Sequence, residues 1–113
     1  MANCINVSLN VNDTANLISG AVVHNSFSGT LTDSYQLNTP EGRNCVVMVF
    51  EKYYMRTSNY ASLSVTIDDF SGPTRVTSVA SGGSQSLINF DWGVSQSFER
   101  VVENALAPYR VYQ

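Results

Sequence analysis

The stretch CVVMVFEKYYMRTSNYASLSVTIDDF, residues 45–70, decides the fold of this chain. It begins with an uninterrupted apolar run, which is typical of a central strand covered on both faces. Residues 60–70 then alternate between polar and apolar side chains, which is the period of a strand with one buried face. Between them, RTSN at residues 56–59 predicts a tight turn. We therefore expect two neighbouring antiparallel strands, residues 45–55 and 60–70. Their core positions include Ala61, Leu63, Val65 and Ile67, and their wet positions include Tyr60, Ser62, Ser64, Thr66 and Asp68.

Working outward, two further segments continue this meander. Residues 27–37 alternate, and the turn cluster NTPEG at residues 38–42 joins them to the central strand as a hairpin. Residues 74–80 follow the break SGP and are rich in β-branched side chains, which favour strands. The small-residue segment SGGSQ, residues 81–85, predicts a loop.

Near the N-terminus, INVSLNV at residues 5–11 alternates strictly and predicts a strand that turns one face to the core. The core face comprises Ile5, Val7, Leu9 and Val11. Turn lengths fix the hairpins that follow, but they do not fix where this first strand docks.

Two helices are expected. Residues 12–14, NDT, can cap a helix over about 14–24, in which apolar residues recur at helical spacing. Gly20 lies inside it at a cost of roughly 1 kcal/mol relative to Ala, so we expect a close approach to the sheet there. A second helix, capped by Asp91, should weaken at Ala107 before Pro108. Its apolar stripe comprises Val94, Phe98, Val101, Val102, Ala105, Leu106 and Tyr109.

The predicted fold is a single α+β domain over residues 1–113, with the element order β-α-β-β-β-β-α. Each helix carries one apolar stripe, so both should cover the same face of one antiparallel sheet. The reverse face is then left to meet something else. This element order resembles the TATA-box-binding-protein-like fold and a reduced helix-grip domain, a likeness that implies no function.

Composition excludes several function classes. Charged residues are 13% of the chain, and the net charge is −3 with six dispersed basic residues. Because phosphate neutralisation carries most nucleic-acid affinity, we expect no nucleic-acid partner. No apolar stretch approaches the roughly 20 residues of a membrane span, and the first residues lack a secretion signal. We expect a cytoplasmic protein with no membrane partner.

The remaining candidates for chemistry favour structural roles. Cys4 and Cys45 should stay thiols in a reducing cytosol, although they could be cross-strand neighbours. His24 lies near a helix end without a nucleophile beside it. The adjacent pair Asp68 and Asp69 should point to opposite faces of a strand and cannot share an ion. The loop at residues 81–85 could present N–H groups to an anion, but plain turn chemistry explains it. We expect no catalytic residue, no metal and no cofactor.

A cluster of aromatic and charged residues surrounds the end of the central strand. Tyr, Met and Arg are enriched at protein interfaces, so the cluster is a candidate interaction surface. The alternative is cross-strand aromatic pairing that stiffens the hairpin. The residues are Tyr35, Glu51, Tyr53, Tyr54, Arg56 and Tyr60.

Three functions stay open. The first is a non-enzymatic interaction module, a homodimer included, because one layer of helices cannot cover both faces of the central strand. The second is a carrier of a small hydrophobic molecule, with a pocket between the sheet and the last helix. That pocket would be lined by Leu87, Phe90, Trp92 and Phe98. An enzyme ranks third, since no nucleophile–base pair, metal set or cofactor motif is recognisable.

The segments VFEKYYMR (residues 49–56), ASLSVT (61–66) and SGGSQ (81–85) resemble a family of small uncharacterised bacterial proteins, a domain of unknown function. The resemblance implies a stand-alone protein of the bacterial cytosol. It brings no catalytic residue and no ligand to this chain.

Overall fold

The computed structural model describes residues 2–24, 30–54, 59–82 and 100–111 of the chain. Its elements are β1 (Ala2–Val7), α1 (Val11–His24), β2 (Thr30–Asn38), β3 (Asn44–Tyr54), β4 (Asn59–Asp68), β5 (Thr74–Gly82) and the 3-10 helix η1 (Ala107–Tyr109). Residues 100–106 are helical and lead into η1. These elements confirm the predicted α+β class and its antiparallel sheet.

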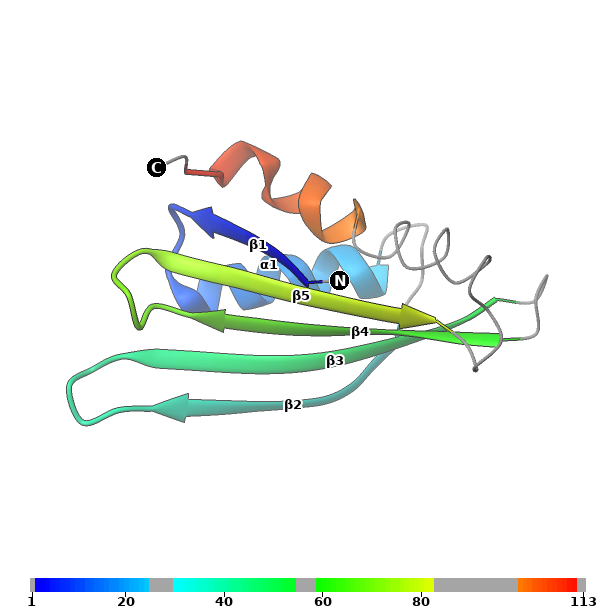
Figure 1. Cartoon of the computed structure of the whole chain (residues 1–113), viewed down its shortest axis with the longest axis horizontal. Coiled ribbons are helices and arrows are strands. Elements are labelled where there is room, and N and C mark those ends of the chain that lie inside the picture. The colour runs from blue at the N-terminus through cyan, green and yellow to red at the C-terminus, as the bar shows by residue number, and fades with distance from the viewer. Residues whose placement is uncertain (1, 25–29, 55–58, 83–99, 112–113) are drawn as a thin grey trace.

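The five strands form one open sheet in the order β1-β5-β4-β3-β2. Strands β2 to β5 are joined as consecutive antiparallel neighbours, as the turn signals predicted. β1 forms the edge of the sheet beside β5 and pairs antiparallel with it, so that Ile5 lies opposite Val76. The chain then crosses through α1 from the β1 edge to the β2 edge (Figure 1). This settles the docking position of the first strand, which the sequence left open.

Both helical segments lie on the same side of the sheet, as predicted (Figure 1). Ile18 and Val22 of α1 and Leu106 of the C-terminal helical segment are completely buried. They join one hydrophobic core with the alternate residues of the strands. The strand residues of this core are Ile5, Val7, Val46, Met48, Phe50, Ala61, Leu63, Val65, Ile67, Val76 and Ala80.

The first strand and the first helix differ from their predicted bounds. β1 ends at Val7, so Leu9 and Val11 are not strand residues, and Val11 opens α1. The reason is the cap. The Oδ1 atom of Asn10 accepts a hydrogen bond from the Asp13 backbone N–H at 2.7 Å, which satisfies a free donor of the first turn. The helix therefore starts earlier than predicted, and its cap is Asn10 rather than residues 12–14.

The predicted close approach at Gly20 is wrong. A Cβ atom built at this position would meet no heavy atom of the described residues within 4 Å. The glycine therefore makes room for no neighbour. The predicted end of the second helix is confirmed, because residues 100–106 are α-helical and the chain tightens into η1 at Ala107 and Pro108. Its predicted cap, Asp91, and the first residues of its stripe, Val94 and Phe98, lie outside the described residues.

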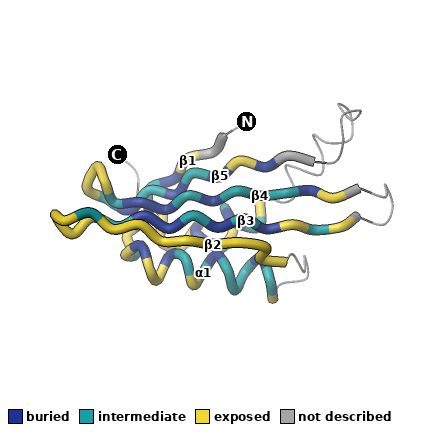
Figure 2. The backbone as a smooth tube through the Cα atoms, turned by 90° about the horizontal axis from the view of Figure 1, so that it is seen from below, coloured by how far each residue is buried: buried dark blue, intermediate teal, exposed yellow. Residues whose placement is uncertain are grey.

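The two edges of the sheet differ in how much of the chain covers them. Along β1, the N–H of Val111 donates to the carbonyl of Asn6 at 2.8 Å, and the N–H of Ser8 donates to the carbonyl of Tyr109 at 2.9 Å. At the other edge, β2 is exposed at all nine of its positions, which Figure 2 shows as an unbroken exposed tube. Its register with β3 shifts once, between Leu31 and Asp33.

Candidate interaction face

The face of the sheet turned away from the helices, here called the outer face, is defined by strand register. Residues directly opposite one another on neighbouring strands point to the same side. Tyr35 lies opposite Val47, which lies opposite Thr66. Thr66 in turn lies opposite Thr77, and Thr77 opposite Cys4. This row crosses all five strands on the outer face.

Part of the β2 and β3 side of this face is apolar. Tyr35 is 56% exposed and Leu37 is 53% exposed, whereas Val47 and Val49 beside them are half-buried. We call these four residues the outer apolar strip. The sequence indicated two of these residues, Val47 and Val49, because the run that begins the central strand is apolar on both faces. Leu37 joined the strip only through the β2–β3 register, so sequence reasoning missed it.

A tyrosine pair lies farther along the same face. Tyr53 and Tyr60 are directly opposite on β3 and β4. Their ring centroids are 4.9 Å apart with an interplanar angle of 57°, a tilted contact of the kind that aromatic pairs prefer. The pair confirms the predicted cross-strand aromatic contact. Both rings nevertheless remain about half exposed, at 46% and 60%, so they also present surface to solvent.

The structure divides the candidate interaction surface into separate places. Glu51 is exposed on the outer face, two positions before Tyr53. Tyr35 lies opposite Val47, six positions before Tyr53, so it is about 20 Å from the tyrosine pair at the rise of an extended strand. The expectation that Tyr35 lies near this pair is therefore wrong. Tyr54 is the last residue of β3, in register with Asn59, and Arg56 lies outside the described residues.

The candidate ligand pocket also lies outside the described residues. Leu87, Phe90, Trp92 and Phe98 all belong to residues 83–99, as does part of the loop predicted to offer N–H groups to an anion. The small-ligand carrier therefore stays a prediction from the sequence.

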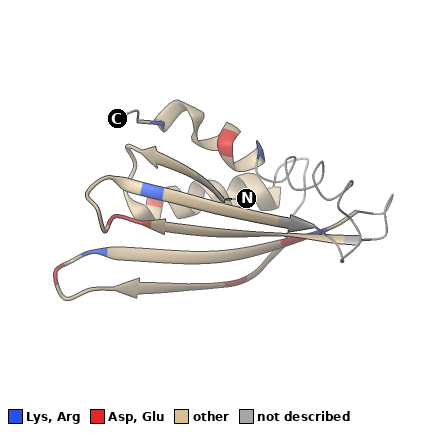
Figure 3. Cartoon of the chain, in the orientation of Figure 1, with Lys and Arg blue, Asp and Glu red and all other residues tan. Residues whose placement is uncertain are grey.

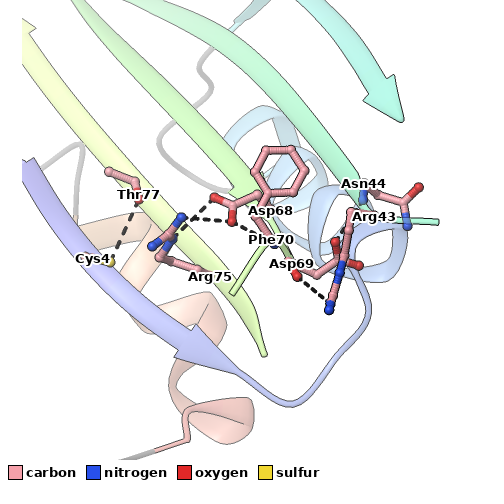
Figure 4. Close-up of polar contacts among 8 residues, drawn as sticks. All are labelled: Cys4, Arg43, Asn44, Asp68, Asp69, Phe70, Arg75 and Thr77. Carbon is pink, nitrogen blue, oxygen red and sulfur yellow. Dashed lines mark hydrogen bonds and ion pairs between the residues drawn. The ribbon is translucent and has the colours of Figure 1, made fainter. Parts of the chain in front are cut away.

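The strongest polar cluster on the outer face is a carboxylate–guanidinium pair. Asp68 Oδ1 accepts from an Arg75 Nη at 3.0 Å, and Asp68 Oδ2 accepts from Arg75 Nε at 3.3 Å (Figure 4). The backbone N–H of Phe70 also donates to Asp68 Oδ1 at 3.2 Å. Asp68 is 5% exposed, so the prediction that its side chain faces solvent is wrong. A paired, hydrogen-bonded carboxylate can be buried where an isolated one cannot.

Asp69 serves a different contact. Its Oδ1 atom accepts from the backbone N–H of Asn44 at 2.8 Å, and its carbonyl accepts from an Arg43 Nη at 2.9 Å (Figure 4). Asp68 and Asp69 therefore bind separate partners, as their adjacency in a strand predicted. In the part of the chain that the structure describes, no three His, Cys, Asp or Glu residues gather as a metal site would require.

The two cysteines are free and far apart in the sheet. Cys4 is exposed on β1 and Cys45 is buried on β3. Because β5 and β4 lie between these strands, the two residues are not cross-strand neighbours, and that alternative is wrong. Burial raises the pKa of the Cys45 thiol above its ordinary value, and the charge of Asp68 opposite raises this pKa further. Cys45 is thus a poor nucleophile at neutral pH.

Other features predicted from the sequence have plain positions. His24 is the last residue of α1 and is exposed. Over the ranges that the structure describes, acidic and basic residues are spread along the ribbon and do not gather into one patch (Figure 3). Among the described residues, no helix combines the length and the apolar character that crossing a membrane would take.

Comparison with known proteins identifies a family. The model of DUF6054, a family of unknown function, matches residues 1–110, so the chain belongs to this family. The predicted resemblance to a domain of unknown function is thereby confirmed. No curated protein and no solved structure matches the chain. Its function has to be argued from its own surface.

Proposed function

We propose that this member of DUF6054 is a non-enzymatic binding module that contacts a protein partner through the outer face of its sheet. One observation carries the proposal. Five of the nine large hydrophobic side chains exposed in the described residues lie on this face by strand register. They are Tyr35, Leu37, Tyr53, Tyr60 and Val79.

The polar residues of the face support a protein partner as well. Between the apolar strip and β1, the face carries small hydroxyl side chains on β4 and β5, among them Ser64, Thr66 and Thr77. Tyrosine supplies rigid contact area, and small hydroxyl residues supply adaptable hydrogen bonds. A face that combines the two resembles the composition of known protein-binding surfaces.

Cross-strand pairing explains part of the aromatic content. Tyr53 and Tyr60 contact each other, which stiffens the hairpin, yet their rings stay 46% and 60% exposed and available to a partner. Tyr35 lies opposite Val47 and Leu37 lies opposite Cys45, yet both remain more than half exposed. Cross-strand pairing does not explain why these two side chains are exposed, whereas a role in binding a partner does.

Affinity purification of tagged protein from the source cells, read by quantitative mass spectrometry, tests the proposal. We expect the double variant Tyr53→Ser/Tyr60→Ser to reduce the recovery of specific partners about tenfold, since an aromatic hot-spot contact contributes about 1.4 kcal/mol or more to binding. The matched control is Phe70→Ser, which removes an aromatic ring that is 48% exposed in the β4–β5 turn. Equal recovery from both variants, or no enrichment above an untagged sample, would contradict the proposal.

We place this module in the bacterial cytoplasm, on the strength of the sequence resemblance. Fractionation of the source cells, followed by immunoblotting of the soluble and membrane fractions, checks that placement.

A further inference from the structure

The sheet has one edge that its own chain covers in part. Residues 109–111 run along β1, where an antiparallel bridge joins Val7 to Arg110. The hydrogen bonds between Val111 and Asn6 and between Ser8 and Tyr109 flank that bridge. The backbone of β1 therefore has partners on its outer side at its C-terminal end.

At the opposite edge, no strand of the described ranges pairs with the outer side of β2. β3 is the strand that pairs with β2 within the described residues, and alternate residues of any antiparallel edge strand direct N–H and C=O groups outward. Natural edge strands are commonly protected by Lys, Pro, short length or bulges. β2 is TLTDSYQLN, nine residues without Lys or Pro. Its one irregularity lies between Leu31 and Asp33, and residues 33–38 beyond it are regular.

We propose that β2 pairs antiparallel with β2 of a second copy of this chain, across a two-fold axis at Gln36, so that two five-stranded sheets become one continuous sheet. The inference goes beyond the proposed function, because the contact is a backbone ladder at the edge of β2, and Tyr35 and Leu37 of the outer face only select its register. The chemistry of β2 favours a second copy of this chain as its partner. In one antiparallel register, the side chains of two β2 strands match each other on both faces of the sheet.

The register follows from the outer-face residues. In a symmetric antiparallel pair, each residue lies opposite one of the same hydrogen-bonding type, so the axis passes through a residue. The regular segment allows Tyr35 or Gln36 as that residue. An axis at Tyr35 would place Leu37 opposite the Asp33 carboxylate. An axis at Gln36 places Tyr35 opposite Leu37 twice, an aromatic–aliphatic pair that stabilises sheets.

The helix-side residues of β2 agree with the same axis. Ser34 and Gln36 lie opposite Met48 and Val46, two buried core residues, yet they are polar and exposed. With the axis at Gln36, its amide meets its own copy, and Ser34 meets Asn38. Polar pairs across an interface account for residues that the core of one copy does not use.

Charge is compatible with this pairing. Asp33 is the one charged residue of β2. In the Gln36 register it lies opposite Thr39, at the end of the ladder and away from the Asp33 of the second copy. The pairing therefore brings no two carboxylates together, although each chain carries a net charge of −3.

The interface is small. A ladder over residues 34–38 is about 17 Å long. A contact along a single strand of this length buries less area than the roughly 800 Å² per partner of a standard interface. We therefore expect a reversible dimer with a dissociation constant on the order of 10–100 µM.

Sedimentation equilibrium of the full chain between about 5 µM and 1 mM tests the dimer. Tyr35→Lys and Leu37→Glu should each weaken association at least about tenfold, because each places a charge against an apolar side chain. The double variant Tyr35→Lys/Leu37→Glu should restore it, since the axis at Gln36 sets the new charges opposite each other. The matched control is Tyr53→Lys, on the outer face but away from β2, which should dimerise like the unsubstituted chain.

Each alternative result overturns the proposal. A strict monomer at 1 mM excludes the dimer. A dimer lost with Tyr53→Lys but kept with Tyr35→Lys shows association through the outer face, which favours the proposed function and excludes the edge. Failure of the double variant to recover excludes the Gln36 register, because an axis at Tyr35 would bring like charges together. Circular dichroism confirms that every variant is folded.

Discussion

Asp68 is the residue whose role changed most between sequence and structure. Its place at the polar end of an alternating strand predicted a wet carboxylate. In the structure it is buried between the Arg75 guanidinium and the Phe70 N–H. Register decides this outcome, because it sets Arg75 of β5 directly opposite Asp68 of β4. The spacing of residues along the chain does not predict the Asp68–Arg75 pair.

The Asp68–Arg75 pair leads to a stability prediction. Arg75→Met should lower the free energy of unfolding by about 1–3 kcal/mol, because a buried carboxylate loses two charge-assisted hydrogen bonds. Arg75 itself is 39% exposed in its side chain, so the loss should fall short of that for a fully buried pair. Urea denaturation measures the change.

Two comparisons separate this cause from general damage. Arg43→Met, which removes an exposed contact to the Asp69 carbonyl, should cost less than about 1 kcal/mol. Asp68→Asn/Arg75→Met should be more stable than Arg75→Met, because no unpaired charge is left in place. Equal losses for the two arginine variants would show that burial of Asp68 is not the cause.

At the scale of single elements, α1 shows how local chemistry sets the bounds of a helix. The alternation of residues 5–11 favours a strand, but the Asn10 side chain bonds the Asp13 N–H and the Thr14 hydroxyl donates to the Asn10 carbonyl at 2.7 Å. These local bonds stabilise the helical turn over the strand pattern. Val11 then uses its apolar side chain in the core from the helix instead of from β1.

Gly20 gives the prediction for this element. Gly20→Ala should raise the free energy of unfolding by about 0.5–1 kcal/mol, because alanine has the higher helix propensity and its methyl group would meet no neighbour. Thermal or urea unfolding measures the gain. The matched control is Gly42→Ala in the β2–β3 turn, where φ is +89°. That change should destabilise the protein by about 1 kcal/mol, since this backbone conformation favours glycine. A loss of stability with Gly20→Ala would show a contact that the structure lacks.

At the scale of the whole molecule, residues 109–111 cover the end of one sheet edge, whereas the other edge, β2, has no strand partner beyond β3 among the described residues. Residues 109–111 bond to β1 next to the point where β1 ends. They come from the far end of the sequence, so the contact also ties the C-terminal helical segment to the first strand. Exposed edges are prone to pair with other chains, and this contact reduces that exposure at β1.

Removal of residues 109–113 tests this role. The Ser8 amide should exchange with solvent at least about tenfold faster, because its acceptor, the Tyr109 carbonyl, is lost. Hydrogen exchange followed by NMR measures the rate. Removal of residues 112–113 alone should leave the Ser8 rate unchanged. Equal protection of Ser8 in both truncated chains would show that another acceptor serves this amide.

Much of the fold was predictable because its signals are local. Alternation at residues 60–70 identified the core side of β4, and Pro and Gly in residues 38–42 identified the hairpin turn. Pro108 marked the end of the last helix. Each of these follows from backbone sterics or side-chain periodicity within a few residues, and such effects act wherever the segment lies in the molecule.

The sequence by itself determined the strand and helix content, the hairpin order and the presence of an uncovered face on the central strand. Only the tertiary structure decided that β1 docks on β5, that Asp68 faces Arg75, and that Tyr35 and Leu37 share the outer face with Val47. These facts depend on register and strand order. A shift of one residue at a bulge moves every later side chain to the other face, and the packing of the whole sheet selects the register.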